Sequence, residues 1–277
     1  MISYGNRLST AIAERGRLCV GIDPHPGILR DWGLGLDVSG LERCARGTVE
    51  ALGDLVPVVK PQSAFFEAYG AAGVAVLERT LADIRSAGAL SLLDVKRGDI
   101  GSTMDAYAAA YLTDGSPLAA DAVTLSPYLG FGSLDGAIAT AEAHGRGVYV
   151  LALTSNPEAR TVQHAIAADG RTVGQLIVDE AARRNLSQDF GAVGIVVGAT
   201  IGATGIDFSK LNGAILAPGI GAQGATATDL PTVFGAALPL VLPSTSRKIL
   251  AAGPERTRLR TAATRALAEM EAALGLG

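Results

Sequence analysis

Short apolar runs rich in β-branched residues alternate along the chain with Ala-rich segments whose apolar positions have helical spacing. The runs lie at residues 17–23, 56–61, 89–96, 121–126, 147–154, 192–199, 213–219 and 238–246. The clearest predicted helices between them lie at residues 41–55, 70–86, 103–112, 133–144, 173–185 and 254–274. Near-continuous apolar strands that alternate with helices indicate a parallel sheet buried on both faces. Eight such strands over about 250 residues fit an α/β fold of the (β/α)₈ barrel (TIM barrel) type better than a doubly wound sheet.

The same pattern predicts a single domain over residues 1–277, because no low-complexity linker interrupts the alternation. An additional helix at about residues 6–14 precedes the first strand, and we expect it to close the bottom of the barrel as an N-terminal capping helix. Residues 33–40 are rich in glycine and predict a loop. The long interval 155–191 predicts an enlarged loop and helix after the fifth strand.

The composition narrows the class of protein. Of the 277 residues, 48% are hydrophobic but only 5% are aromatic, so the core must be mainly aliphatic. A net charge of −4 without any basic run does not favour nucleic-acid binding. The two cysteines match neither a disulfide framework nor a metal-binding pair, and three scattered histidines do not favour a zinc site. Neither a signal peptide nor a membrane span is predicted, so we expect a soluble, cytoplasmic protein.

Polar residues gather where the apolar runs end. In a (β/α)₈ barrel, the C-terminal ends of the strands and the loops that follow them build the active site. The residues found there are Asp23, Lys60, Asp94, Lys96, Ser126, Thr154, Ser155, Pro218–Gln223 and Ser244–Arg247. Lysine is normally a surface residue. Because the chain has only four lysines, two of them at strand ends favour a functional site.

The densest group of charges lies in the segment SLLDVKRGDIGST, residues 91–103. Asp94 and Lys96 are two positions apart, so in a strand both point to one face, here the barrel interior. Arg97 alternates away from that interior, and we expect it to be structural. Asp99 lies beyond the strand, where an aspartate commonly caps the next helix. In isolation, the group could be a strand-end ion pair followed by a capping aspartate.

Charged residues on the neighbouring strands favour a functional array over that simpler interpretation. Asp23 and Lys60 end the first and second strands at equivalent heights. Opposite charges in such an array hold each other ionised despite desolvation. A lysine fixed between carboxylates stays protonated and can deliver a proton, while the carboxylates face any anionic group of a substrate. The array therefore suits a reaction that loses negative charge and then needs a proton.

A glycine-rich segment, APGIGAQG, follows the seventh predicted strand at residues 217–224 and matches GxGxxG. A dinucleotide site would require an acidic residue about 20 positions later. The next acids are Asp229 and Glu255, so a nicotinamide cofactor is disfavoured. Backbone amides of such a loop can instead cradle a phosphate, typically after strands seven and eight of a barrel. Arg247 follows the eighth strand and can add a bidentate guanidinium, although a flexible turn and a surface arginine are the alternative.

These segments resemble a known family. LLDVKRGDIGST resembles the Asp-x-Lys-x-x-Asp signature of the orotidine 5′-phosphate decarboxylases. VGIDPHP, VVKPQSAFFE, APGIGAQG and PSTSR resemble further blocks of that family in the same order, most closely in its longer bacterial (type 2) subfamily. A wider group of barrels shares the signature, including the metal-dependent 3-keto-gulonate-phosphate decarboxylase and hexulose-phosphate synthase. Those two resemble each other in having an acidic metal ligand after strand two. This chain has Lys60 there, which favours the metal-free decarboxylase.

The resemblance implies decarboxylation of orotidine 5′-phosphate to UMP and carbon dioxide in de novo pyrimidine biosynthesis, with no cofactor and no metal. It implies that Lys96 donates a proton to C6 of the pyrimidine within a network that also contains Lys60, Asp94 and Asp99. Roles in substrate binding are implied for Asp23, Ile100, Thr103, Ser155, Pro218, Gln223, Gly224 and Arg247.

Those binding roles differ by position. Asp23 with Lys60 would hold the ribose hydroxyls, Ser155 would contact the pyrimidine, and Pro218 would line its pocket. The phosphate would be bound by Gln223, Gly224 and Arg247. Members of the family are homodimers with shared sites, and the residues implied to reach into the partner's site are Asp99, Ile100 and Thr103.

The residues themselves leave three other functions open. The first is a metal-dependent sugar-phosphate decarboxylase or aldolase on the same barrel. The second is an aldolase that forms a Schiff base through Lys60 or Lys96. The third is a barrel that binds a phosphorylated metabolite without catalysis.

Overall fold

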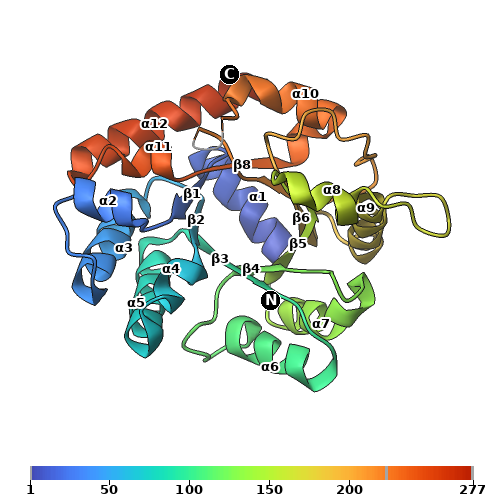
Figure 1. The fold of residues 1–277 in the computed structure, drawn as a ribbon, viewed down its shortest axis with the longest axis horizontal. Helices are drawn as coiled ribbons and strands as arrows, with labels where there is room; N and C mark the ends of the chain where they lie inside the picture. The colour runs from blue at the N-terminus through green and yellow to red at the C-terminus, as the bar shows by residue number, and fades with distance from the viewer. Residues whose placement is uncertain (1, 222–223, 276–277) are drawn as a thin grey trace.

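The computed structural model describes residues 2–221 and 224–275 of the chain. Eight parallel strands pair in chain order, and the last pairs with the first, so the sheet closes into a barrel (Figure 1). The strands are β1 Cys19–Ile22, β2 Val58–Pro61, β3 Leu90–Arg97, β4 Ala122–Leu125, β5 Gly147–Leu153, β6 Gly191–Val197, β7 Gly213–Ala217 and β8 Val241–Thr245. Each lies within a predicted run or extends it by one residue, and the predicted (β/α)₈ barrel is confirmed.

Helices surround the barrel on its outer side (Figure 1). They are α1 Tyr4–Arg15, α2 Pro26–Asp31, α3 Val38–Leu52, α4 Ser63–Glu67, α5 Gly70–Ala87, α6 Gly101–Leu112, α7 Asp135–Ala143, α8 Arg160–Gln163, α9 Val173–Arg184, α10 Leu230–Phe234, α11 Arg247–Leu250 and α12 Arg256–Ala273. The helices predicted between the strands correspond to α3, α5, α6, α7, α9 and α12. The others besides α1 have four to six residues, too few for a helical period to be visible in the sequence.

The predicted loop at residues 33–40 was wrong at its end, because α3 already begins at Val38. Asp37 caps this helix by accepting a hydrogen bond from the backbone of Gly40 at 2.8 Å. A Cβ at Gly40 would lie 1.9 Å from the carbonyl oxygen of Gly35. The glycine therefore serves a close contact between helix and loop, and it does not mark loop conformation.

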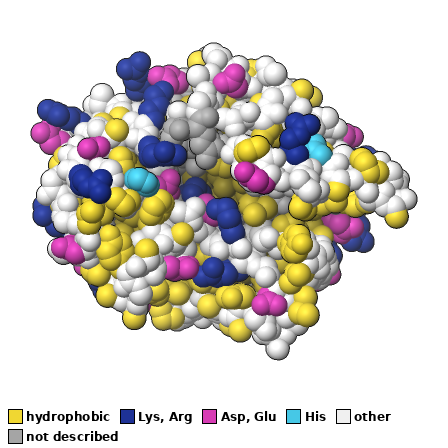
Figure 2. Space-filling model, viewed as in Figure 1, with side chains coloured by type: hydrophobic (Ala, Val, Ile, Leu, Met, Phe, Trp, Pro, Cys, Tyr) yellow, Lys and Arg dark blue, Asp and Glu magenta, His cyan; other side chains and the backbone are white. Residues whose placement is uncertain are grey.

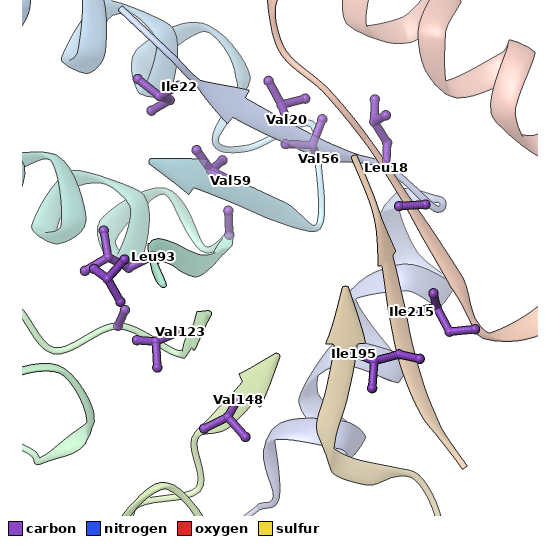
Figure 3. Packing of buried hydrophobic residues seen from close by; sticks show 14 of the residues in the cluster. Leu18, Val20, Ile22, Val56, Val59, Leu93, Val123, Val148, Ile195 and Ile215 are labelled. Carbon is purple, nitrogen blue, oxygen red and sulfur yellow. The ribbon is translucent and has the colours of Figure 1, made fainter. Parts of the chain in front are cut away.

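The core has two layers separated by the strands. Side chains that point outward from the strands pack against the helices, and Figure 3 shows residues of this outer layer, including Val20, Val59 and Ile215. Side chains that point inward fill the lower part of the barrel and pack against α1. They include Cys19, Val58, Leu92, Ala122, Tyr149, Ala214 and Leu242. This apolar plug leaves only the opposite end of the barrel for polar chemistry.

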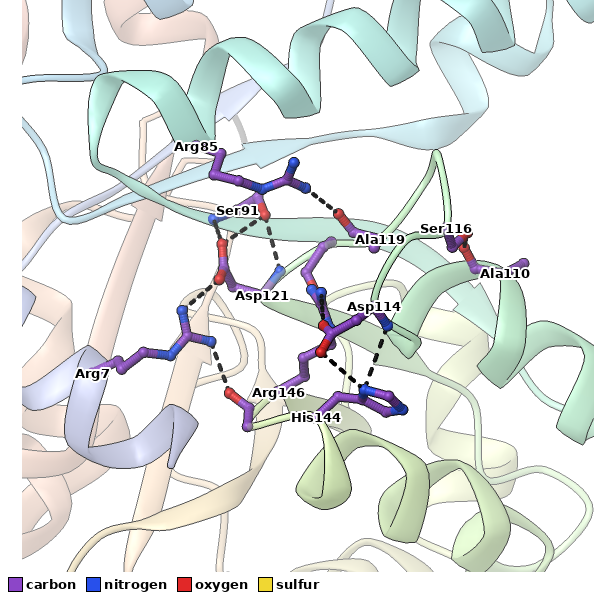
Figure 4. Close-up of polar contacts among 12 residues, drawn as sticks. Arg7, Arg85, Ser91, Ala110, Asp114, Ser116, Ala119, Asp121, His144 and Arg146 are labelled. Carbon is purple, nitrogen blue, oxygen red and sulfur yellow. Dashed lines mark hydrogen bonds and ion pairs between the residues drawn. The ribbon is translucent and has the colours of Figure 1, made fainter. Parts of the chain in front are cut away.

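Helix α1 packs against the inward-pointing side chains at the bottom of the barrel. Its Tyr4 is 2% exposed, and its hydroxyl is hydrogen bonded to the hydroxyl of Tyr149 at 3.0 Å. Arg7 donates hydrogen bonds to Asp121 at 2.6 Å and to the carbonyl of Gly145 at 2.8 Å (Figure 4). These contacts join the helix to the loops that precede β4 and β5.

The buried tyrosine pair makes a measurable contribution to stability. We expect Tyr4→Phe to lower the free energy of unfolding by about 1–3 kcal/mol, because it leaves the Tyr149 hydroxyl buried without a partner. The double variant Tyr4→Phe/Tyr149→Phe removes both hydroxyls and should be close to wild type in urea denaturation. A double variant less stable than either single variant would contradict this account.

Candidate active site

Strand alternation brings charged side chains to the C-terminal end of the barrel. Asp23 follows β1, Lys60 lies in β2, and Asp94 and Lys96 lie in β3. All four line one cavity of about 230 Å³ above the apolar plug. Figure 2 shows basic and acidic side chains close together in a hollow near the middle of this face of the molecule. The predicted gathering of charges at strand ends is confirmed.

The carboxylate of Asp94 is the centre of the cluster and accepts four hydrogen bonds. Its Oδ1 accepts from the Lys96 Nζ at 2.6 Å and from the Thr124 hydroxyl at 2.8 Å. Its Oδ2 accepts from the Lys60 Nζ at 2.9 Å and from the Gln62 Nε2 at 3.0 Å. Because a carboxylate has about four acceptor positions, Asp94 is saturated and cannot rotate without losing contacts.

The cluster is ionised although most of it is buried. Burial alone would raise the pKa of Asp94, but the ammonium groups of Lys60 and Lys96 outweigh it and hold that pKa well below its usual range. Burial alone would lower the pKa of Lys60, but the carboxylates of Asp94 and Asp23 raise it above its ordinary value. At neutral pH the site therefore presents a buried carboxylate between two cations.

This electrostatic coupling predicts a pH dependence of stability. An unfolded aspartate has a pKa of about 3.9, so the stabilisation from ionised Asp94 is present above about pH 4. It is lost as the pH falls toward the lowered pKa of the folded state, with a slope of up to about 1.4 kcal/mol per pH unit. Asp94→Asn should therefore make the free energy of unfolding fall less steeply than in wild type between pH 4 and pH 2. Equal slopes in urea denaturation would contradict the coupling.

Two buried polar atoms beside the cluster lack partners among the residues that the structure describes. They are the Oδ1 of Asp23 and the Oγ of Ser246. A Cβ at Gly21 would lie 2.8 Å from the Ser246 Cβ and 3.5 Å from the Asp23 Oδ1, so both residues lie against Gly21. Buried polar groups are normally hydrogen bonded. Both residues line the cavity, so a polar ligand in it could satisfy them.

The loops after β7 and β8 form another wall of the cavity. Pro218 and Arg247 line it, together with Gly219, which has a φ of 106° that favours glycine. Gly224 instead lines a separate pocket together with Asp229. Gln223 lies outside the described residues. Ser155, two residues after the end of β5, also lines the cavity.

Three predicted site residues lie away from this cavity within the chain. Asp99, Ile100 and Thr103 are absent from its lining. The Asp99 carboxylate accepts a hydrogen bond from the backbone of Ile100 at 2.8 Å and does not cap α6, whose N-cap is Ile100. The side chain of Ile100 is 62% exposed. Within a single chain, the expected network therefore contains Lys60, Asp94 and Lys96 but lacks Asp99.

Arg97 has the structural role expected from its position. Its guanidinium donates to Glu67 at 2.7 Å and to the Tyr111 hydroxyl at 3.4 Å, and it lies 5.5 Å from the ring centre of Tyr107. It therefore joins α4 and α6 on the outer side of β3.

Sequence reasoning missed two residues of the site, Gln62 and Thr124. Both carry polar side chains and lie at inward-facing positions near strand ends, Gln62 two positions after Lys60 and Thr124 in β4. The alternation that selected Asp94 and Lys96 could also have selected them. Gln62 was missed because it lies just beyond the apolar run 56–61, and Thr124 was missed because Ser126 marks the polar end of its run.

A closed parallel barrel with a charged cavity at the C-terminal ends of its strands has the architecture of the (β/α)₈ barrel enzymes. Residues 16–262 match the model of the orotidine 5′-phosphate decarboxylase/HUMPS family, and the chain belongs to this family. Orotidine 5′-phosphate decarboxylase from Salinispora arenicola is 62% identical over 275 residues, 99% of each chain. The Streptomyces coelicolor enzyme of the same name is 55% identical over 275 residues, again 99% of each.

Solved structures agree with this assignment. A Streptomyces avermitilis protein, provisionally identified as an orotidine 5′-phosphate decarboxylase, has a TM-score of 0.96 at 55% identity, covering 99% of this chain and 97% of its own. Leishmania donovani OMP decarboxylase has a TM-score of 0.78 at 28% identity, covering 99% of this chain and 100% of its own. Separately, none of the helices in residues 2–221 and 224–275 is long and apolar enough to cross a membrane.

Proposed function

We propose that the chain catalyses decarboxylation of orotidine 5′-phosphate to UMP and carbon dioxide, the reaction of de novo pyrimidine biosynthesis, without a cofactor. The lysine–aspartate–lysine cluster in the cavity carries this proposal. The family model covers both orotidine 5′-phosphate decarboxylases and the HUMPS group, but relatives at 50% and 62% identity are named as orotidine 5′-phosphate decarboxylases.

The cluster suits the proposed chemistry. Breaking the bond between C6 and the carboxylate leaves the electron pair on C6 as carbon dioxide departs. The ammonium of Lys96 stabilises that carbanion and then gives it a proton. The Lys96 side chain is 46% exposed at the cavity, whereas its Nζ is held 2.6 Å from Asp94. It is thus both accessible to substrate and fixed in position.

A metal-dependent reaction at this site is less well supported. Such a reaction would need Asp94 as a metal ligand. Its two carboxylate oxygens are already bound by the Lys60 Nζ at 2.9 Å and the Lys96 Nζ at 2.6 Å. In the part of the chain that the structure describes, no three His, Cys, Asp or Glu residues are grouped as a metal would require. Loss of activity with a chelator would favour the metal-dependent alternative.

A Schiff-base aldolase is also less well supported, because its lysine must be a neutral amine. The pKa of Lys60 is raised, and Lys96 is paired with Asp94. Covalent trapping of a sugar phosphate by borohydride at either lysine would favour that alternative.

The proposed function is tested by incubating the purified protein with orotidine 5′-phosphate and quantifying UMP and carbon dioxide. We expect equal amounts of the two products. Binding of UMP without any conversion of orotidine 5′-phosphate would contradict the proposal and indicate a non-catalytic binding barrel.

The proposed substrate orientation follows the polarity of the cavity wall. Asp23 and Lys60 would hold the ribose hydroxyls, which is supported by the unpartnered Oδ1 of Asp23. Ser155 would contact the pyrimidine, and Pro218 would line its pocket. The phosphate would lie at the other wall and be bound by Arg247, with Gln223 and Gly224 as further proposed contacts.

The phosphate contact predicts a selective loss of affinity. Arg247→Ala should raise the KM for orotidine 5′-phosphate about 10- to 100-fold, because it removes charge-assisted hydrogen bonds. Turnover of orotidine, which lacks the phosphate, should be the same in the variant and in wild type. An equal loss with both substrates would show that Arg247 acts on folding or chemistry instead.

We also propose a homodimer in which Asp99, Ile100 and Thr103 complete the partner's site. Hydrophobic side chains are exposed on two adjacent loops, with Ile100 62%, Tyr128 78% and Leu129 51% exposed. The loops are joined by a hydrogen bond from the backbone of Ser126 to Arg97 at 2.7 Å. An apolar surface of this kind is typical of a protein interface.

Subunit mixing tests the shared site. Lys96→Ala and Asp99→Ala should each be inactive alone. A mixed dimer contains one site with both Lys96 and Asp99 intact and one site that lacks both. At most about half of the sites in the mixed dimers should therefore be active. Absence of recovery, despite subunit exchange shown by mass spectrometry, would contradict the arrangement.

A cytoplasmic location is part of the same proposal. Cys19 and Cys44 are both buried and unpaired. Unpaired cysteines are typical of proteins from reducing compartments.

A further inference from the structure

Lys96 has a backbone conformation that is unusual for its residue type. Its φ is +45°, in the left-handed region. Among the described residues other than glycine, only Asn212 shares this feature, with a φ of 43°. Asparagine adopts the left-handed region readily, whereas lysine does so at a cost in free energy. Contacts around Lys96 must therefore hold it there.

The pairing of β3 with β4 is irregular at the same place. The register runs regularly up to Leu93 opposite Val123 and resumes only at Arg97 opposite Leu125. The backbone N–H groups between these points are thus not paired with the backbone of β4 in the ordinary way. They need another acceptor, because buried N–H groups are rarely left unsatisfied.

The hydroxyl of Thr124 on β4 is that acceptor. Its Oγ1 accepts from the backbone N–H of Val95 at 3.0 Å and from that of Lys96 at 2.9 Å. It also donates its own hydrogen to the Asp94 Oδ1 at 2.8 Å. Thr124 is only 1% exposed, and these three bonds use the full capacity of a hydroxyl.

We propose that Thr124 is a positioning residue that sets the Lys96 ammonium and the Asp94 carboxylate relative to each other. One oxygen holds both the backbone from which Lys96 projects and the carboxylate that its Nζ contacts. Thr124 lines the cavity, but its hydrogen is engaged by Asp94, so it acts through its two neighbours. The inference rests on the proposed function, because it concerns the geometry of the proton donor.

Thr124→Val tests this, since valine keeps the shape and removes the hydroxyl. We expect kcat to fall about 10²-fold, the effect of a small displacement of a catalytic group, with KM changed less than about threefold. Thr124→Ser keeps the hydroxyl and should retain kcat within about fivefold of wild type. A Thr124→Val kcat within threefold of wild type, or a serine variant as slow as the valine variant, would overturn the proposal.

Thr80→Val is the matched control. Thr80 is 0% exposed, and its hydroxyl donates to the carbonyl of Val76 within α5, so it is as buried as Thr124 but its hydrogen bond stays within its own helix. We expect it to change kcat less than about twofold. If Thr80→Val lowered kcat as much as Thr124→Val, the effect would be general destabilisation and the proposal would be wrong.

A crystal structure of the Thr124→Val protein gives a readout that is independent of activity. We expect Lys96 to leave the left-handed region and its contact with Asp94 to lengthen. Lys96 unchanged in φ and in that contact would overturn the positioning role. Failure of the wild-type protein to convert orotidine 5′-phosphate would overturn the proposed function alone, and the crystal structure would still decide on Thr124.

Discussion

Lys96→Ala is expected to lower kcat for orotidine 5′-phosphate by at least about 10⁴-fold, because it removes both the cation that stabilises the carbanion and the proton that quenches it. Binding of UMP should change less than about tenfold, since the contacts proposed for the ribose and the phosphate involve other residues of the cavity. The measurement is steady-state turnover together with calorimetric titration of UMP. The variant should remain folded, because the Lys96 side chain is 46% exposed and Lys60 still neutralises Asp94.

Lys210 offers a control for this experiment. It is an exposed lysine outside the cavity, in the segment between β6 and β7. Lys210→Ala should keep wild-type kcat. A Lys96→Ala protein that retained near wild-type turnover would contradict the assignment of the proton donor.

Lys60→Met is expected to lower the free energy of unfolding by about 1–3 kcal/mol, because it removes one of the two ammonium groups that bind the buried Asp94 carboxylate. The side chains of Lys60 and Asp94 are each only 8% exposed, so water cannot replace the lost partner, and Asp94 keeps Lys96 as its one remaining cation. The pKa of Asp94 should rise accordingly. Urea denaturation at neutral pH measures the change, and turnover should be lost as well.

The double variant Lys60→Met/Asp94→Asn separates stability from function. It removes both members of the most buried ion pair and leaves Lys96, whose side chain is 46% exposed and open to water, so at least half of the lost stability should return. Activity should remain lost, because the charged array itself is missing. If stability stayed as low as in Lys60→Met, packing of the lysine side chain and not its charge would explain the first result.

The ordinary rules of strand alternation predicted most of the fold and the centre of the site. Each β-branched run became a strand, and Asp94 with Lys96 reached the barrel interior as their spacing required. The backbone conformation at Lys96 differs from that of a regular strand, however. Its left-handed φ and its bond to Thr124 depend on a neighbouring strand 28 residues away in sequence. A period of two cannot reveal such a local irregularity.

The periodic pattern of apolar residues could predict neither the short helices nor the role of Asp99. Helix α4 contributes Glu67, which binds Arg97, yet it has only five residues. The signature spacing groups Asp99 with Asp94 and Lys96, but within the chain its carboxylate contacts the backbone of Ile100. Whether that carboxylate serves another subunit depends on contacts between chains, which no property of the local sequence encodes.

The central claim is that this cluster decarboxylates orotidine 5′-phosphate without a metal. The most direct test follows the loss of orotidylate absorbance in the presence of excess EDTA, with wild type and Lys96→Ala measured in parallel. The account predicts undiminished turnover for wild type with EDTA and a rate at least about 10⁴-fold lower for the variant. Loss of wild-type turnover on chelation, or equal rates for the two proteins, would contradict it.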